Sequence, residues 1–334
     1  MTVATDLFDR QLRDLRISVT DRCNFRCTYC MPKEMFGPGY EFLPRDQLLT
    51  FEEITSVVRQ FAARGVTKVR ITGGEPLLRK GVEDLIGMIA RVEGVEDLTL
   101  TTNASLLARK AEALFSAGLD RVTVSLDAMD DPTFQEMNDV GFPVSTVLEA
   151  IDVAAHAGLG PIKVNAVIKR GVNEHAVLDM ARHFKGTGHI VRFIEYMDVG
   201  NSNGWRLDDV VPADEMIEAI SEAIPLEPIP ANYPGEVANR FRYLDGTGEV
   251  GVIASVTKPF CGSCTRARIS AEGTLYTCLF ASSGTSLREV IRSGGDVGAT
   301  IEEVWAKRDD RYSEIRSSNT ARLSVPVEMS YIGG

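Results

Sequence analysis

Three cysteines lie within eight residues near the amino end of the chain: Cys23, Cys27 and Cys30, separated by three and by two residues. Thiolates grouped this tightly suit a soft metal centre, either zinc or an iron–sulfur cluster. Three thiolates are one fewer than a structural zinc site or a closed cubane requires. A cluster held by this trio would therefore keep one iron open for chemistry.

A second trio of cysteines occurs in the last third of the chain, so the six cysteines divide three plus three. Cys261 and Cys264 form a C-x2-C knuckle, and Cys278 follows a predicted hairpin. A structural zinc site is the alternative, and it would need a fourth ligand. The four histidines all lie between residues 156 and 189, remote in sequence from this trio, but a carboxylate could serve instead. Arg266 and Arg268 follow the knuckle on one side of a predicted strand, and two guanidinium groups so placed suit a phosphate.

The composition is that of a soluble globular protein, with 44% hydrophobic and 25% charged residues among 334. The net charge of −11 argues against a nucleic-acid or membrane partner, so an anionic ligand needs a locally positive site. The amino-terminal segment has no apolar run that predicts a signal peptide or a membrane span. Six cysteines in such a chain indicate reduced, metal-binding thiols, and we expect a cytoplasmic protein.

Short β-branched runs alternate with amphipathic helical patterns between residues 15 and 196. This alternation predicts parallel strands with right-handed crossovers, here six units of a partial (β/α)6 TIM-type barrel with its site at the carboxyl ends of the strands. The predicted strands are Leu15–Thr20, Thr67–Thr72, Leu98–Thr102, Arg121–Leu126, Ile162–Ile168 and Ile190–Tyr196. The predicted helices are Phe51–Ala63, Val82–Val92, Ser105–Ala117, Ser145–Ala157, Asn173–Phe184 and Ala213–Ala223.

A Pro-rich stretch at residues 225–234 reads as a linker. We place the domain boundary there, between a barrel domain (1–224) and a C-terminal α+β extension (225–334) that carries the second trio.

Polar residues occupy one face of the predicted strands. Lys68, Arg70 and Thr72 share a face of the second strand, and Lys163 and Asn165 share a face of the fifth. Since helices cover the outside of such a barrel, the polar face should point inward. Basic residues in the lumen predict a cavity for a polar, anionic ligand; a sheet with one solvated face is the alternative.

The turn after the second strand reads Thr72-Gly73-Gly74-Glu75-Pro76, and two adjacent glycines let the backbone approach a ligand closely. A C-x3-C-x2-C loop followed by Gly-Gly-Glu-Pro resembles the radical S-adenosylmethionine enzymes. In that family the cysteines hold a [4Fe–4S] cluster whose open iron binds S-adenosylmethionine, and Gly-Gly-Glu-Pro holds its amino group. One electron from the cluster then breaks a carbon–sulfur bond and yields a 5′-deoxyadenosyl radical.

The resemblance becomes more specific along nearly the whole chain. The segments CNFRCTYCMP, RITGGEPLLR, VTVSLDAMD, VRFIEYMDVGNSNGW, FCGSCTRARISAEGTLYTCLF and MSYIGG occur in the order found in the GTP 3′,8-cyclase family, which opens molybdenum cofactor biosynthesis. The resemblance implies a lyase in which the radical removes the ribose 3′ hydrogen of GTP and the C3′ radical attacks C8, giving 3′,8-cyclo-7,8-dihydro-GTP. It also implies a second [4Fe–4S] cluster that binds the guanine. One departure is Ala104, where the family has glycine, and this leaves the conformation of the Thr-Thr-Asn turn open.

Position by position, the resemblance implies roles for cofactor and substrate ligands and no further catalytic residue. The first cluster would be held by Cys23, Cys27 and Cys30, and the second by Cys261, Cys264 and Cys278. S-adenosylmethionine would be lined by Tyr29, Gly74, Ser125 and Met197. GTP would be contacted by Arg16, Arg70, Thr101, Lys163, Arg266, Ala267 and Arg268, and Lys68 is added because it shares the face of Arg70.

The family also implies partners: GTP, a reducing electron donor and, downstream, cyclic pyranopterin monophosphate synthase. It further implies a homodimer, although this sequence shows no interface. The terminal Gly333-Gly334 implies a tail that reaches into the active site. Two other functions remain open. One is a radical S-adenosylmethionine peptide-modifying maturase with an auxiliary cluster, which usually carries more C-terminal cysteines; the other is a non-catalytic zinc-knuckle binding protein.

Overall fold

The computed structural model describes residues 3–316 and 326–333. Six parallel strands, each hydrogen-bonded to the next, form an arc of the partial barrel. They are β1 (Asp14–Ser18), β2 (Lys68–Thr72), β3 (Asp97–Thr102), β4 (Arg121–Ser125), β5 (Lys163–Ile168) and β6 (Ile190–Glu195). Each overlaps a strand predicted from the sequence, so the predicted fold class is confirmed.

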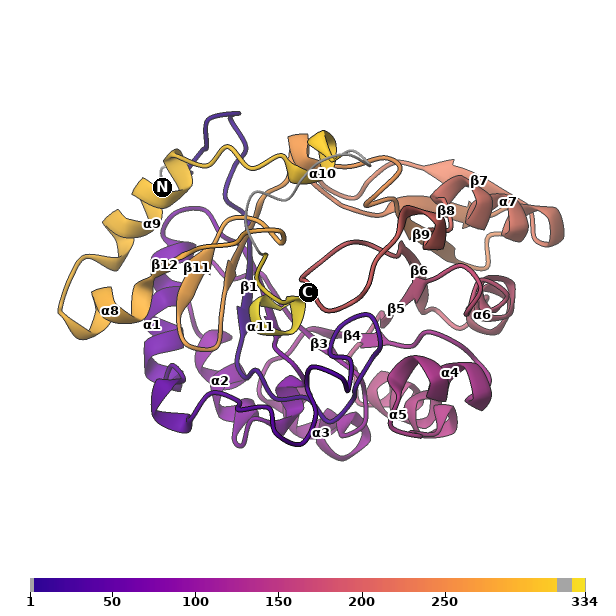
Figure 1. Ribbon diagram of the computed structural model, residues 1–334, viewed down its shortest axis with the longest axis horizontal. Helices are drawn as coiled ribbons and strands as arrows, with labels where there is room; N and C mark the ends of the chain where they lie inside the picture. The colour runs from indigo at the N-terminus through magenta and orange to yellow at the C-terminus, as the bar shows by residue number, and fades with distance from the viewer. Residues whose placement is uncertain (1–2, 317–325, 334) are drawn as a thin grey trace.

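Helices cover the outside of the arc (Figure 1). They are α1 (Phe51–Ala62), α2 (Val82–Ile89), α3 (Leu107–Ser116), α4 (Asp131–Asn138), α5 (Val144–His156), α6 (Ala176–Phe184) and α7 (Ala213–Ala223). Helix α1 shows why the sequence starts a helix at this point. The Thr50 hydroxyl accepts a hydrogen bond from the Glu53 amide at 3.1 Å, and the Glu53 carboxylate accepts one from the Thr50 amide at 2.8 Å.

Strand alternation separates the core from the lumen as predicted. On β5, Val164, Ala166 and Ile168 are fully buried beneath the helices, whereas Lys163 and Asn165 point to the other face and are half-buried. The apolar layer between strands and helices is therefore the core, and the polar side chains are left for the cavity.

Helix α4 was not predicted, because its apolar residues are few and its sequence is mostly polar. Its start is nevertheless encoded locally. The Asp130 carboxylate caps the Thr133 amide at 2.9 Å, and Pro132 occupies the first turn, where no amide hydrogen is needed.

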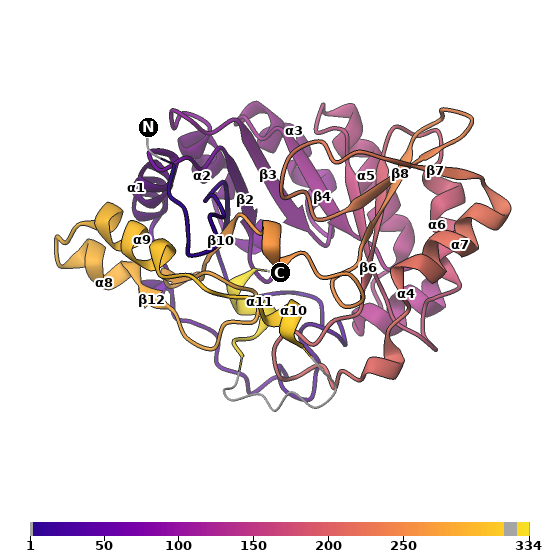
Figure 2. The same cartoon turned by 90° about the horizontal axis from the view of Figure 1, so that it is seen from above.

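The C-terminal part of the chain extends the same sheet at both ends (Figure 2). Beyond β6 lie β9 (Glu249–Ile253), β8 (Asn239–Tyr243) and β7 (Leu226–Ile229), and beyond β1 lie β10 (Arg266–Ile269), β11 (Thr274–Tyr276) and β12 (Thr285–Ser286). The proposed linker therefore contains a strand. Pro228 is tolerated because β7 is an edge strand. The boundary at residue 225 stays a prediction.

The remaining elements are four helices and four 3-10 turns of the described residues. They are α8 (Leu287–Arg292), α9 (Val297–Ala306), α10 (Tyr312–Ile315), α11 (Met329–Ile332), and the 3-10 turns η1 (Arg45–Gln47), η2 (Pro76–Leu78), η3 (Leu207–Asp209) and η4 (Cys261–Ser263). Helix α11 lies inside the arc (Figure 1). Over the described residues, none of the helices has both the length and the apolar character needed to cross a membrane.

Candidate active site

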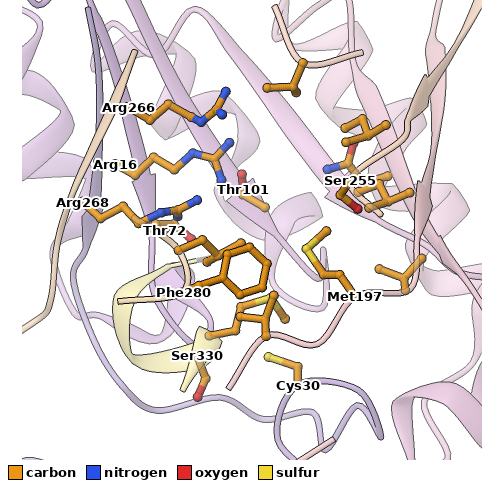
Figure 3. A pocket seen from close by; sticks show the side chains of 18 of the residues that line it. Arg16, Cys30, Thr72, Thr101, Met197, Ser255, Arg266, Arg268, Phe280 and Ser330 are labelled. Carbon is orange, nitrogen blue, oxygen red and sulfur yellow. The ribbon is translucent and has the colours of Figure 1, made fainter. Parts of the chain in front are cut away.

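Both cysteine trios line one cavity on the inner side of the arc. The cavity wall includes most of the side chains and glycines expected at the site: Cys23, Cys27, Cys30, Cys261, Cys264, Cys278, Tyr29, Gly74, Ser125, Met197, Arg16, Arg70, Thr101, Arg266 and Arg268. In Figure 3, Arg16, Arg266 and Arg268 extend from one wall, Met197 and Ser255 lie on the opposite side, and Cys30 lies at one end with Ser330.

The loop of the first trio is anchored by aromatic packing and by a buried carboxylate. Phe25 packs against Phe142 and Phe134, with ring centroids 5.1 and 6.4 Å apart. The Tyr29 hydroxyl donates to the Asp127 carboxylate at 2.9 Å, and that carboxylate also accepts from the Val167 amide at 2.9 Å. Asp127 therefore ties the loop to the ends of β4 and β5.

Burial raises the pKa of all three thiols in this loop, to about 12 for Cys23. Like-charge repulsion from Cys23 also raises the pKa of Cys27 and of Cys30, and Cys30 raises that of Cys27. A cation among these crowded thiols would favour their thiolate forms, and iron would supply that charge.

Glu75 of the Gly-Gly-Glu-Pro turn organises the adjacent Thr-Thr-Asn turn. Its buried carboxylate accepts from the Thr102 hydroxyl and the Asn103 amide, both at 2.8 Å, and from the Leu77 amide at 3.0 Å. Burial raises the pKa of Glu75 to about 7. Ala104 adopts a left-handed conformation with φ of 63°, so the turn keeps the shape that glycine would adopt at lower cost.

Gly74 illustrates why this turn needs glycine. A Cβ on Gly74 would lie 2.6 Å from the backbone carbonyl carbon of Arg22, so the turn packs directly against the loop that carries the first trio.

In the second trio, Cys261 and Cys264 lie on η4 and the residue that follows it, before β10, and Cys278 lies just after β11. Burial by itself would raise the pKa of the Cys264 thiol, but the positive charges of Arg266 and Arg308 outweigh it and lower the pKa to about 7. Arg266 also donates to the Cys264 sulfur at 3.2 Å. The pKa of Cys278 is raised by burial to about 12.

Four arginines form a basic wall because three neighbouring strands pair in register. Arg16 of β1 stands opposite Arg268 of β10 and Arg70 of β2, and Arg266 lies two residues before Arg268 on β10. Burial and the charge of neighbouring arginines lower the pKa of Arg16 and of Arg268, the latter to about 10. The Nε atoms of Arg16 and Arg70 are buried and find no hydrogen-bond partner within the described part of the chain. Such a wall is suited to an anion with several negative oxygens.

Three expected GTP contacts do not line this cavity in the part of the chain that the structure describes. Ala267 lies on the outer face of β10 and is fully buried in the core. Lys68 lies one step deeper in the barrel, where its ammonium group contacts Asp97 at 3.1 Å and the Tyr233 hydroxyl at 3.2 Å. The third is Lys163 at the start of β5, where burial and nearby positive charges lower its pKa to about 7.

The sequence reasoning also missed residues that line the cavity. Arg192 of β6 donates to Asn165 of β5 at 2.9 Å, and burial lowers its pKa to about 9. Its alternation with Val191 and Phe193 is the same signal that placed Arg70 in the lumen, so it could have been found. Phe280 carries no such signal, since its position depends on stacking against Tyr312, with centroids 4.6 Å apart.

The donor sets fit iron–sulfur clusters. All six thiols are free, partly exposed and directed into one cavity. Among the residues described, no three His, Cys, Asp or Glu side chains converge as the ligands of a single metal ion do. The ligands of a cubane bind different irons and do not have to converge on one atom. The zinc-knuckle alternative therefore gains no support.

Comparison with known proteins agrees with this geometry. The family model of the Radical SAM superfamily matches residues 17–184, half of the chain, and a model described as Molybdenum Cofactor Synthesis C matches residues 189–314. The crystal structure of Streptococcus suis SuiB bound to S-adenosylmethionine superposes with a TM-score of 0.66 at 16% identity, covering 95% of this chain and 71% of that one. The fold, the first trio and the Gly-Gly-Glu-Pro turn thus define a member of the radical S-adenosylmethionine superfamily.

Curated relatives narrow the assignment. Proteins named GTP 3′,8-cyclase from Acidothermus cellulolyticus, Xanthomonas campestris pv. campestris (strain B100) and Staphylococcus epidermidis are 54%, 51% and 47% identical; each alignment covers at least 98% of this chain and 97% of the relative. The chain belongs to the GTP 3′,8-cyclase family. Its cofactors are S-adenosylmethionine and two [4Fe–4S] clusters, which the two trios of thiols fit.

Proposed function

We propose that this chain converts GTP into 3′,8-cyclo-7,8-dihydro-GTP, the first step of molybdenum cofactor biosynthesis. The observation that carries the proposal is that two thiol trios and a wall of four arginines line a single cavity. A radical generator, a second cluster with a free coordination site and a triphosphate site would then be within reach of one nucleotide.

The first trio, Cys23, Cys27 and Cys30, would hold the cluster beside the Gly74 turn. When bound there, the cluster and S-adenosylmethionine supply the 5′-deoxyadenosyl radical that removes the ribose 3′ hydrogen. Tyr29, Ser125 and Met197 also line this part of the cavity and would orient S-adenosylmethionine there.

The arginine wall would bind the triphosphate. Arg16, Arg266 and Arg268 extend in parallel from neighbouring strands (Figure 3), and Arg70 is held by the hydroxyls of Thr101 and Thr123, each at 3.0 Å. A triphosphate would offset the mutual repulsion of these groups, so binding energy is available to orient the ribose and guanine. Lys68 and Lys163 would add positive charge below this wall, and Ala267 would contribute backbone only.

The C-terminal segment would close the cavity. The Gly333 carbonyl accepts a hydrogen bond from Arg268, and a Cβ on Gly333 would collide with Thr72. The Glu328 carboxylate accepts from the Asn201 amide at 3.0 Å and from the Ser202 hydroxyl at 2.9 Å, which ties the segment to the loop after β6. Gly334 lies outside the described residues.

The wider setting of the reaction is part of the proposal. A reducing electron donor would supply the first cluster, the product would pass to cyclic pyranopterin monophosphate synthase, and the chain would work in the cytoplasm as one unit of a homodimer. The barrel domain (1–224) would generate the radical, and the C-terminal domain (225–334) would carry the second cluster.

The decisive experiment is an anaerobic turnover assay. The reconstituted, reduced protein is incubated with S-adenosylmethionine and with GTP, ATP or no nucleotide, and 5′-deoxyadenosine and cyclised nucleotide are quantified. We expect both products with GTP only. Cleavage without nucleotide preference would favour a peptide-modifying maturase, and no cleavage by a fully loaded protein would refute the radical chemistry.

A further inference from the structure

A buried network of two arginines and one aspartate lies behind the second cysteine trio. Asp6 sits in the amino-terminal segment, and its carboxylate bonds to Arg10 at 2.6 Å and to Arg308 at 3.1 Å. The side chains of the two arginines are each 2% exposed and that of Asp6 is 0% exposed. Two guanidinium groups therefore share one carboxylate in the interior, and their other donors need partners.

Those partners are backbone carbonyls beside the cysteines. Arg10 donates to the carbonyl of Cys261 at 2.9 Å. Arg308 donates to the carbonyl of Cys264 at 2.9 Å and to that of Thr277 at 3.1 Å. Thr277 directly precedes Cys278, so the network contacts the backbone at or next to each member of the trio.

The network is itself fixed by packing. The indole nitrogen of Trp305, at the end of α9, donates to the Arg10 carbonyl at 3.1 Å, and the guanidinium of Arg308 lies over the Trp305 ring, 4.6 Å from its centroid. Arg10 also donates to the Asp310 carbonyl at 2.8 Å. The three residues therefore have little freedom to move, and neither do the carbonyls that they hold.

The trio needs such support because its members come from two separate pieces of chain. Cys261 and Cys264 lie on η4 and the residue that follows it, and Cys278 lies beyond the β10–β11 hairpin. The backbone of η4 leaves most of its polar groups without helical partners. A planar, permanently charged guanidinium that bonds to several carbonyls at once fixes their relative positions better than a lysine could.

We propose that Asp6, Arg10 and Arg308 are positioning residues for the second cluster: they set the spacing of its three cysteines and place two guanidinium groups behind it. This inference deepens the proposed function and depends on the second cluster being present. Arg308 also lies 3.4 Å from the Asp310 carboxylate, so the two guanidinium charges are matched by the carboxylates of Asp6 and Asp310. Loss of either arginine would leave a net negative charge beside a thiolate-bound cluster that becomes more negative on reduction, and would therefore disfavour the reduced form.

A general stabilising role is the competing explanation, because removing one partner from any buried ion network destabilises a fold. The two explanations differ in where the damage occurs. A positioning role affects the second cluster selectively, whereas a general loss of stability affects both clusters.

The test uses two single-cluster forms of the full-length chain. One carries Cys23→Ser, Cys27→Ser and Cys30→Ser and retains the second site; the other carries Cys261→Ser, Cys264→Ser and Cys278→Ser and retains the first.

Into each form we introduce Arg308→Gln, Arg308→Lys or Arg10→Gln. The matched control is Arg170→Gln, which removes an exposed arginine whose two nitrogens pair with Glu215 at 3.0 and 2.6 Å. The readouts are iron and sulfide content, the rate at which a chelator withdraws iron, and the reduction potential from the electron paramagnetic resonance signal.

We expect chelator-driven iron loss from the second-site form to become at least tenfold faster with Arg308→Gln and with Arg10→Gln, and the reduction potential to fall. Arg308→Lys keeps the positive charge but loses the planar guanidinium that bonds to several carbonyls at once. The reduction potential should therefore stay close to that of the parent, whereas iron loss should still become faster. In the first-site form, every variant and the control should stay within twofold of the parent.

Equal acceleration of iron loss in both forms would overturn the proposal in favour of a general structural role. Unchanged iron loss and potential in a well-loaded second-site form would overturn it as well, while leaving the proposed function intact. A second-site form that binds no iron and sulfide even with the network unaltered would overturn the proposed function and this inference together.

Discussion

Replacing Arg268 by methionine should stabilise the empty protein and weaken GTP binding at the same time. Arg268 is 4% exposed, and its pKa is lowered from 12.5 to about 10 by burial first and then by the charge of Arg266. A lowered pKa means that the charged form of the side chain is less stable in the folded than in the unfolded chain. In the proposed function, the triphosphate of GTP would offset this cost when it meets the Arg268 guanidinium.

The magnitude follows from the size of this shift. Lowering the pKa of Arg268 from 12.5 to about 10 corresponds to about 3 kcal/mol by which the charged guanidinium destabilises the folded state. The variant also loses the hydrogen bond from Arg268 to the Gly333 carbonyl, which subtracts about 1 kcal/mol. We therefore expect Arg268→Met to raise the free energy of unfolding of the ligand-free chain by roughly 2 kcal/mol, within the range seen when buried charges are replaced by apolar side chains.

The sign of the pH dependence is also fixed. The pKa of Arg268 is lower in the folded than in the unfolded chain, so the destabilisation is fully present below pH 10. It is relieved as the pH rises from about 10 towards 12.5. The stability difference between variant and parent should therefore be constant from pH 7 to 9 and narrow above pH 10.

Urea unfolding of cluster-free protein measures the stability term, and equilibrium binding of GTP to the loaded protein measures the affinity. We expect affinity to fall roughly 10- to 100-fold, the value of one lost charged hydrogen bond. Arg170→Met, at an exposed ion pair, should change stability by less than about 1 kcal/mol and leave GTP binding unchanged. Lower stability in Arg268→Met, or unchanged GTP affinity, would refute the view that this arginine is held in an unfavourable site for its ligand.

Three further outcomes are expected. Burial raises the pKa of Glu75 from 4.5 to about 7, so its contribution to stability is fully present below pH 4.5 and is lost as the pH rises through about 7. The free energies of unfolding at pH 5 and at pH 7.5, measured with urea, should therefore differ by about 2 kcal/mol less in Glu75→Gln than in the parent, and the same pH dependence in both proteins would contradict this. Deletion of Gly333 and Gly334 should leave iron and sulfide content unchanged but impair formation of the cyclised nucleotide in the anaerobic assay; undiminished product would show that the tail is dispensable. Asp127→Ala should raise the KM for S-adenosylmethionine about tenfold, because it frees Tyr29 and leaves the Val167 amide unpaired. Asp127→Asn can still accept a hydrogen bond from that amide and should raise the KM less, so equal kinetics for the two variants would argue against this anchoring role.

Much of this protein was readable from local sequence. Three features depend only on neighbours a few positions away in the sequence. They are the spacing of each cysteine trio, the alternation that puts Arg70 inside the barrel, and the capping residues of α1. Arg192 could have been found by the same alternation. Helix α4 was missed because its few apolar residues give a weak periodic signal, although its cap is local.

Sequence by itself therefore determined which residues carry chemistry, roughly where the six barrel strands and six of the helices begin, and which faces of those strands turn inward. Tertiary structure alone decided that β10 pairs with β1, which brings Arg268 beside Arg16, and that Asp6 and Arg308 meet behind the second trio. Those partners are separated by some 250 to 300 residues. No local propensity links them, because their pairing is selected by the packing and hydrogen bonding of the whole sheet.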